Sequence, residues 1–285
     1  MKNLLLRSIT GIVYVAFICG SVLAGGLSFT IAFGFVAILA LNEFYKIVNA
    51  SNGGEKTQTL ITDIVGGLIL SIGLFSINMG IFSSCNREVL CGGLFSAYLL
   101  YLIARLVLQL YTKEASPLVN LAYSFMGQVY VALPLGLMSM FYTLPDGKSL
   151  LMSMFIMIWL NDTGAFCVGS LIGKHKFFPR ISPKKSWEGF IGGVVFAVAS
   201  SFAFKFGFSQ YFESVTIVEL FGMGAVVALF ATWGDLVESL IKRTLGVKDS
   251  GSLLPGHGGI LDRIDSLLLV VPASLFYLIV IRLFV

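Results

Sequence analysis

The sequence predicts an all-α, polytopic membrane protein, and its composition and its long hydrophobic runs are the observations that predict it. Of the 285 residues, 57% are hydrophobic and only 12% are charged, whereas about a quarter of the residues are charged in an ordinary soluble domain. The mean hydropathy is +0.91. Apolar runs of about 18 residues or more recur along the chain, each long enough to cross a hydrocarbon core about 30 Å thick. These features exclude an ordinary soluble domain.

Nine apolar segments are each expected to form a transmembrane helix. They cover residues 9–24, 27–45, 60–82, 89–111, 118–142, 150–172, 190–208, 215–240 and 264–285. Short polar loops between them favour antiparallel neighbours in one bundle. We expect residues 1–148 to form an N-terminal transmembrane region of about five spans. Residues 149–285 are expected to form the region that carries the chemistry, with most of the charge in loops 173–189 and 241–263.

The basic residues predict how the chain is oriented in the membrane. With a cytoplasmic N-terminus, all but four of the 19 lysines and arginines fall on the cytoplasmic side, Arg105 among them; the exceptions are Arg87, Lys148, Lys205 and Arg282. This asymmetry follows the positive-inside rule. We therefore expect a cytoplasmic N-terminus and a cationic cytoplasmic surface that suits anionic head groups or anionic soluble substrates.

Carboxylates within the predicted spans require a physical or a functional reason. Asp162 lies about 10 residues before the end of its span and Asp235 about eight residues before Arg243, which puts them roughly 15 and 12 Å deep at ~1.5 Å per residue. An uncompensated carboxylate at such depth costs about 2–3 kcal/mol. Asp63 and Glu219 lie nearer the ends of their spans and are expected to contact water.

Two polar stripes flank loop 241–263. Each stripe has its members at i, i+3 and i+4, the first also at i+7, and hence on one helical face: Asp235, Glu238, Ser239 and Lys242 before the loop, and Asp262, Asp265 and Ser266 after it. Because the loop is short, both faces are expected to line one cavity at the cytoplasmic side. The alternative is a structural network of ion pairs along the same two helices.

Carboxylates that converge from two helices beside clustered cations suit Mg²⁺ bridging to a phosphate-bearing ligand, since Mg²⁺ is usually held by one or two carboxylates, waters and substrate phosphates. We predict Asp235 and Asp262 as its ligands. Asp265 and Glu238 are expected to complete the site or to hold a second cation. Two histidines and four scattered cysteines offer no ligand set for zinc.

Both charged loops also have the composition of phosphate-binding segments. Loop 173–189 contains five cations and His175, which can bind several phosphate oxygens; the alternative is an ordinary solvated loop. Loop 241–263 contains His257 followed by Gly258 and Gly259, and backbone N–H groups of glycines can approach phosphate oxygens closely.

These motifs resemble those of the phosphatidate cytidylyltransferase (CDP-diacylglycerol synthase) family. The resemblance rests on three blocks that keep the family's order and spacing: Asn161-Asp162-Thr163 with Gly173-Lys174-His175 and the run from Ile181 to Gly189; Gly234-Asp235 with Glu238; and Ser239-x-x-Lys242-Arg243, Lys248-Asp249, His257-Gly258-Gly259 and Asp262-Arg263-x-Asp265. The blocks cover the chain from about Asn161 onward. The N-terminal half resembles the family only in being hydrophobic and multispanning.

The resemblance implies a Mg²⁺-dependent, dimeric enzyme of the inner (cytoplasmic) membrane that transfers CMP from CTP to phosphatidic acid and releases pyrophosphate. Its active site would face the cytoplasm. The catalytic residues would be Asp235, Asp262, Lys242 and Arg263. The substrate-binding residues would be Ser182, Lys184, Lys185, Ser239, Arg243, Lys248, His257, Gly258 and Gly259, and supporting roles would fall to Asn161, Asp162 and Glu188.

Two other classes of protein could carry some of these features. A transporter or channel would explain the intramembrane carboxylates, but it predicts internal repeats and charge that reaches both faces of the membrane. A related lipid enzyme that uses CTP, such as a CDP-archaeol synthase or a polyprenol kinase, would share the site and differ in its acceptor or its released product.

Overall fold

The computed structural model describes residues 2–51, 57–80, 86–112, 116–251, 253 and 258–284, and these are predominantly helical. The α-helices of this part are α1 (Lys2–Leu23), α2 (Gly26–Ser51), α3 (Thr57–Asn78), α4 (Arg87–Tyr111), α5 (Pro117–Gly127), α6 (Leu133–Leu137), α7 (Gly147–Ile172), α8 (Trp187–Phe202), α9 (Ile217–Thr244) and α10 (Leu261–Phe284). Short π- and 3₁₀-helical segments cover Gln128–Ala132, Met138–Thr143, Ala203–Gly207 and Ser209–Tyr211.

Eight helical segments of the described chain are long and apolar enough to cross a membrane. They are Gly26–Ser51, Thr59–Asn78, Arg87–Tyr111, Pro117–Thr143, Gly147–Ile172, Trp187–Gly207, Ile217–Thr244 and Leu261–Phe284. A shorter apolar helix, Ile9–Leu23, lies where the first span was predicted. The prediction of an all-α, polytopic bundle is therefore confirmed.

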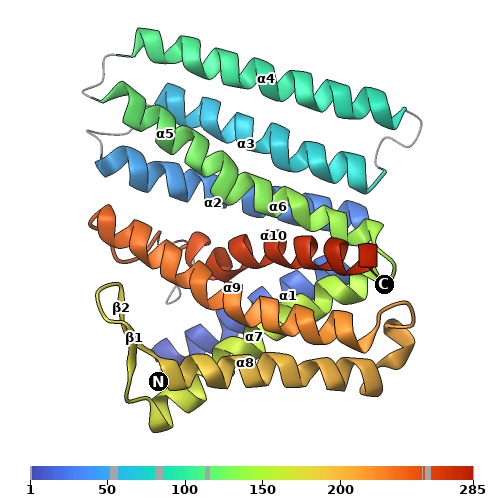
Figure 1. Cartoon of the computed structure of the whole chain (residues 1–285). Helices are drawn as coiled ribbons and strands as arrows, with labels where there is room; N and C mark the ends of the chain where they lie inside the picture. The colour runs from blue at the N-terminus through green and yellow to red at the C-terminus, as the bar shows by residue number, and fades with distance from the viewer. Residues whose placement is uncertain are drawn as a thin grey trace. The chain divides into compact units, whose positions relative to one another are not determined.

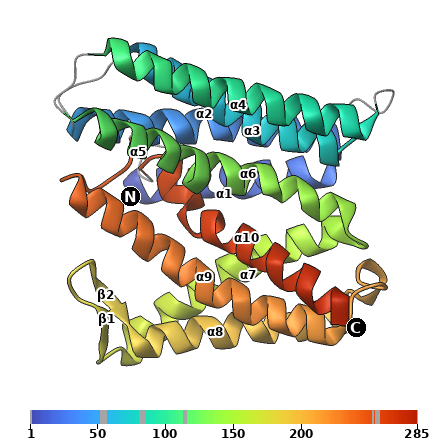
Figure 2. The same cartoon turned by 45° about the horizontal axis from the view of Figure 1, so that its top comes forward.

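The chain forms two compact units, and the first contains Met1–Met140 together with Leu245–Arg263. Within it α3 packs against both α2 and α4, as Figure 1 and Figure 2 show. Gly66 and Gly73 of α3 lie directly against Tyr101 and Leu94 of α4, where an added Cβ would collide with the larger side chain. Small residues let membrane helices approach closely, so these glycines determine how α3 and α4 pack.

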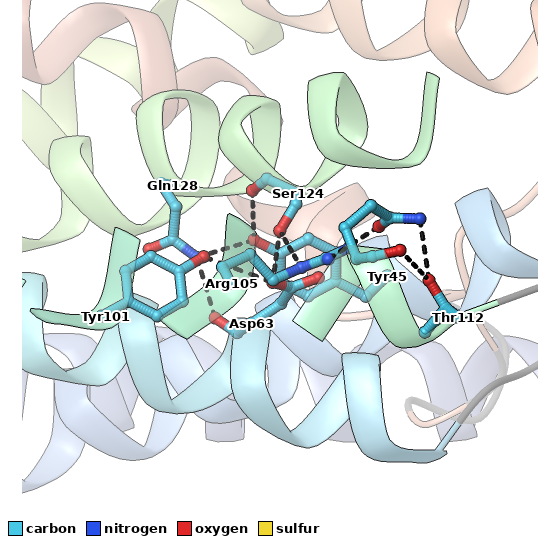
Figure 3. Close-up of polar contacts among 8 residues, drawn as sticks. Tyr45, Asp63, Tyr101, Arg105, Thr112, Ser124 and Gln128 are labelled. Carbon is cyan, nitrogen blue, oxygen red and sulfur yellow. Dashed lines mark hydrogen bonds and ion pairs between the residues drawn. The ribbon is translucent and has the colours of Figure 1, made fainter. Parts of the chain in front are cut away.

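A buried ion pair in the first unit corrects one expectation (Figure 3). Asp63 is 4% exposed and Arg105 only 1%. The Arg105 Nε donates to Asp63 Oδ1 at 2.8 Å and to Ser124 Oγ at 3.0 Å, and its Nη1 donates to Gln109 Oε1 at 2.8 Å. The prediction that Asp63 contacts water is wrong. A position near the end of a span says nothing about the partner on a neighbouring helix.

Further hydrogen bonds join this ion pair to two more helical segments (Figure 3). The Ser124 hydroxyl also donates to Asp63, and Tyr45 of α2 donates to the Ser124 carbonyl at 2.7 Å. Gln128 Nε2 donates to the Tyr45 hydroxyl and to the Asp63 carbonyl, each at 2.8 Å. The network therefore links α2, α3, α4 and the helical segment that contains Ser124 and Gln128.

The second unit contains Phe141–Thr244 and Ile264–Val285, and its helices α7, α8 and α9 pack on one another. Glycines bring α7 and α8 into close contact: a Cβ on Gly164 would lie 2.9 Å from the Gly192 carbonyl, and one on Gly189 would lie 2.8 Å from the Ala165 carbonyl. The division of the chain into these two compact units reflects packing. The predicted division into residues 1–148 and 149–285 concerns which part carries the chemistry, and it stays a prediction.

Glu219, at the start of α9, also differs from its prediction. It is 3% exposed, and its Oε1 lies 2.5 Å from Arg282 Nε of α10. The expectation that Glu219 contacts water is therefore wrong. Again the reason is a cation on another helix that no local pattern predicts.

Loop 173–189 contains a small β-hairpin in an otherwise helical chain. Strand β1 (Lys176–Phe178) pairs antiparallel with β2 (Ser182–Ser186), with Lys176 opposite Ser186 and Phe178 opposite Ser182. The hairpin leads directly into α8, beside whose first turn it lies in Figure 2. The charged loop thus has a defined backbone that can hold its lysines in place.

Candidate active site

A cavity of about 490 Å³ lies in the second unit, lined by residues of α7, α8, α9 and both strands of the hairpin. Its polar wall includes Asn161, Asp162, Lys184, Lys185, Thr232 and Asp235. Its apolar wall includes Phe166, Phe177 and Phe190. Five residues that the sequence predicted for the site therefore share one cavity: Asn161, Asp162, Lys184, Lys185 and Asp235.

Glu188 fixes the start of the hairpin against helix α8. Its carboxylate accepts hydrogen bonds from the backbone N–H groups of Lys174 and His175, each at 3.2 Å, and lies 2.6 Å from His175 Nδ1. Ser186 caps α8 by accepting from the Gly189 N–H at 3.1 Å, which satisfies one of the unpaired donors of the first turn. These contacts hold the chain on both sides of Lys184 and Lys185.

Aromatic packing supports the same segment. The ring of Phe177 stacks on Phe190 with centroids 5.3 Å apart and meets Trp187 edge-on at 4.4 Å. Because Phe177 belongs to β1 and the other two to α8, this cluster attaches the hairpin to the helix that follows it.

Lys185 connects the hairpin to helix α9. Its Nζ lies 2.8 Å from Asp235 Oδ2 and donates to the Thr232 carbonyl at 3.1 Å. Because the Lys185 ammonium pairs with Asp235, it offsets the cost of placing this carboxylate within a membrane-spanning helix.

Asp235, Glu238 and Asp265 form an acidic cluster in which one ligand atom of each lies within 4.8 Å of the others. Asp235 and Glu238 come from adjacent turns of α9, and Asp265 comes from α10. The helices approach closely because Gly234 leaves room: a Cβ there would lie 2.6 Å from the Asp265 carbonyl. The Ser266 hydroxyl donates to the Ala231 carbonyl at 3.1 Å and links the same two turns.

The cluster fits a hard divalent cation in donor type and in charge. All of its side-chain ligands are carboxylate oxygens, which Mg²⁺ prefers. Lys185 pairs with Asp235, and Lys242 Nζ lies 2.9 Å from Glu238 Oε2, so two lysines face three carboxylates. Like charges this close disfavour full ionisation unless further positive charge is present.

Asp262 makes its described contacts in the first unit. Its Oδ2 accepts from the backbone N–H groups of Ser250 at 3.0 Å and Gly259 at 2.8 Å. The neighbouring Gly258 has φ +84°, a conformation that glycine adopts without strain. Loop residues predicted to bind phosphate are thus organised around Asp262.

The remaining predicted site residues are placed as follows. Ser182 begins β2 and is half-buried, and the Ser239 hydroxyl lies 3.3 Å from Asp235 Oδ1. Arg243, Lys248 and Arg263 are exposed. His257 lies outside the described residues.

Sequence reasoning overlooked Glu43, a buried carboxylate of α2. Its Oε2 accepts from Ser250 Oγ at 3.2 Å and from the Leu261 N–H at 2.9 Å. The signal was present, because Glu43 lies inside the predicted span 27–45 just as Asp162 and Asp235 lie inside theirs.

Comparison with known proteins agrees with the motifs. Residues 5–281 match the cytidylyltransferase family. The chain is 34% identical over 267 residues to a phosphatidate cytidylyltransferase of Staphylococcus aureus (strain COL), a match that covers 93% of this chain and 95% of the relative. It is 41% identical over 161 residues to a phosphatidate cytidylyltransferase of Staphylococcus haemolyticus, covering 56% of this chain and 60% of that relative. Both halves of the chain lie within the family match, and the chain belongs to the cytidylyltransferase family.

Proposed function

We propose that this protein is a phosphatidate cytidylyltransferase, which transfers CMP from CTP to phosphatidic acid to form CDP-diacylglycerol and pyrophosphate in phospholipid biosynthesis. The observation that carries the proposal is a cavity lined by Lys184, Lys185 and Asp235, of which Asp235 also belongs to the acidic cluster. The names of the Staphylococcus relatives support the choice of substrates.

The cavity suits the two substrates in size and in character. Small-molecule sites are commonly about 300–1,000 Å³, and this one is about 490 Å³. Lysines at its wall attract phosphate groups. The aromatic side chains of Phe166, Phe177 and Phe190 offer an apolar surface to an amphiphilic lipid.

The proposed cofactor is Mg²⁺, held by Asp235, Glu238 and Asp265. Asp262 is proposed as a further ligand because it lies three residues before Asp265 in α10, a spacing that puts both on one helical face. Bound Mg²⁺ would neutralise charge on the phosphates as the reaction proceeds.

The chemistry requires positioning more than proton transfer. A phosphate monoester has a second pKa of about 6, so the phosphatidate oxygen is already ionised at neutral pH. That oxygen forms a new bond to the α-phosphorus of CTP, the bond to the β-phosphate oxygen breaks, and pyrophosphate leaves with the electron pair. No general base is needed, and we therefore propose His257 as a phosphate ligand.

The residues of the chain bring two polyanions together and stabilise the leaving group. We propose that Lys184, Lys185, Lys242, Arg243, Lys248 and Arg263 hold the triphosphate and the lipid phosphate. The hydroxyls of Ser182 and Ser239 and the N–H group of Gly258 would donate further hydrogen bonds to the substrates, while the Gly259 N–H donates to Asp262. Asn161, Asp162 and Glu188 would support the cavity wall.

The basic residues also support a cytoplasmic active site in the inner membrane, with the N-terminus on the same side. We also propose that the protein is a homodimer, because the resemblance to the family implies a dimeric enzyme.

A direct assay tests the proposal. The purified protein in detergent is given CTP, phosphatidic acid and Mg²⁺, and released pyrophosphate is measured. We expect pyrophosphate in equal amount to CDP-diacylglycerol, with both requiring the lipid. Release of CDP would indicate a kinase instead, and turnover only with another phospholipid acceptor would indicate a different CTP-dependent enzyme.

A further inference from the structure

Glu43 is a buried carboxylate that contacts the loop before α10. It lies in the membrane-spanning helix α2 and is 9% exposed. Its two hydrogen-bond donors, Ser250 Oγ and the Leu261 N–H, come 207 and 218 residues later in the chain. A buried carboxylate is costly unless it is hydrogen-bonded, so these long-range bonds compensate for placing Glu43 in α2.

Two glycines of the loop make room for this carboxylate. A Cβ on Gly251 would lie 2.6 Å from Glu43 Oε1, and a Cβ on Gly259 would collide with Glu43 Oε2. Any larger residue at either position would displace the carboxylate or the loop. The close fit of Gly251 and Gly259 shows that the loop backbone packs directly on Glu43.

Ser250 relays this contact to Asp262. Its hydroxyl donates to Glu43 at 3.2 Å and accepts from the Asp262 N–H at 3.2 Å, while its own N–H donates to Asp262 Oδ2 at 3.0 Å. The position of Asp262 therefore depends on a residue that Glu43 holds.

Glu43 also accepts a hydrogen bond at the first residue of α10. Leu261 is the first residue of α10, and the first N–H groups of a helix have no acceptor within it. A carboxylate at this end satisfies one of them and interacts favourably with the helix dipole. Asp262 is the next residue, so its backbone is fixed by the same contact.

We propose that Glu43 is a positioning residue for cytidylyl transfer, which holds Ser250 and Leu261, the first residue of α10, so that Asp262 is correctly placed. This inference rests on the proposed function, in which Asp262 is a ligand of the catalytic cation. Glu43 acts through hydrogen bonds to the loop and does not contact the reacting atoms.

Both hydrogen bonds end on one oxygen of Glu43, and this allows a sharp test. Glutamine keeps one carbonyl oxygen and can replace that acceptor, whereas leucine has a similar size and no acceptor. We expect E43L to lower kcat by about 30- to 100-fold, with KM for CTP and phosphatidate changed less than about threefold, because misplacing a catalytic group by about 1 Å can cost about 100-fold. E43Q should keep kcat within about fivefold of wild type.

A second readout does not depend on activity. Lys248 is exposed and lies two residues before Ser250, so trypsin cleavage after Lys248 in detergent, without substrates, reports release of the loop. We expect E43L to accelerate this cleavage by about tenfold or more and E43Q by much less. Cleavage after Lys184 in the hairpin should be unchanged in both variants.

Asp63→Asn is the matched control. Asp63 is another buried carboxylate of the same unit, but its hydrogen bonds go to α4 and α5. We expect this variant to lose thermal stability without faster cleavage after Lys248, which separates general loosening from release of the loop.

The outcomes are decisive either way. Wild-type kcat in E43L, or unchanged cleavage after Lys248, overturns the inference. Equal loss of kcat in E43Q and E43L would mean that the charge of Glu43 acts directly and would overturn a positioning role. If the wild-type protein releases no pyrophosphate, the proposed function fails, while the cleavage series still decides whether Glu43 anchors the loop.

Discussion

Single residues of the candidate site are arranged so that each buried or half-buried carboxylate meets a cation or an N–H group. Asp235 meets Lys185, Glu238 meets Lys242, and Asp262 accepts two backbone N–H groups. Such contacts offset the cost of placing carboxylates in a low-dielectric environment.

Replacing Asp235 by asparagine should abolish most activity. We expect kcat/KM to fall by about 100-fold or more, because the amide carries no charge to hold a cation or to balance Lys185. Pyrophosphate release and thermal unfolding in detergent are the measurements. Asp146→Asn is the control, since Asp146 belongs to the same unit and its carboxylate accepts from the Ser214 N–H, as an amide oxygen also can. Retention of more than about a third of the activity in Asp235→Asn would contradict the assignment.

Lys184→Ala should weaken substrate binding. Lys184 lines the cavity and is exposed, so under the proposed function its charge would act on substrate phosphates in a partly solvated setting. We expect KM for CTP or phosphatidate to rise about five- to tenfold at low salt, with a smaller difference from wild type at high salt. Lys148→Ala removes an exposed cation at the start of α7, whereas the α7 residues that line the cavity begin at Asn161. This variant should leave both KM values unchanged. Unchanged KM values in Lys184→Ala would argue against a phosphate role.

At the scale of helices and strands, close packing at glycines and buried polar contacts set the geometry. In the second unit Gly234 brings α9 against α10 and so places Asp265 beside Asp235 and Glu238. In the first unit the network around Asp63 and Arg105 joins helices that differ in sequence position by up to about 80 residues. Specific polar contacts therefore join the N-terminal helices of the first unit to one another.

Arg105→Ala should destabilise the first unit strongly. Removing one partner of a buried ion pair leaves the other charge uncompensated and typically costs about 3–5 kcal/mol. We expect a clear fall in thermal stability in detergent and in the yield of folded protein. Arg87→Ala, an exposed arginine of the same helix, should change stability by less than about 0.5 kcal/mol. Equal stability of the two variants would mean that the network contributes little.

At the scale of the whole molecule, cation binding should be coupled to folding. A ligand that binds only the folded state stabilises it by about 2.7 kcal/mol at 100 times its Kd. We expect Mg²⁺ to raise the thermal unfolding temperature of the wild-type protein in detergent and EDTA to reverse the effect. The shift should be absent in Asp235→Asn and retained in Asp146→Asn. An equal shift in all three proteins would indicate non-specific binding of Mg²⁺.

Much of the architecture could be predicted from the sequence because it depends on local patterns. Runs of apolar residues predicted the membrane-spanning helices, and the eight long helices and the shorter Ile9–Leu23 lie where they were expected. Spacing along one helix predicted that Asp235 and Glu238 lie on one face, and both belong to the acidic cluster. Three further residues that the sequence predicted for the site, Asp162, Lys184 and Lys185, line the cavity. The hairpin was not predicted, because its strands are short and local sequence does not show the packing of Phe177 on Trp187 and Phe190 of α8.

The sequence alone determined the fold class, the charged loops and the motifs that place the chain among the cytidylyltransferases. Only the tertiary structure decided which partner each buried charge has. Asp63 and Glu219 were expected to contact water and instead pair with Arg105 and Arg282, and Glu43 contacts a loop more than 200 residues away. Burial and long-range pairing depend on how helices pack, and hydrophobic periodicity within one helix carries no information about the charge that faces it on another.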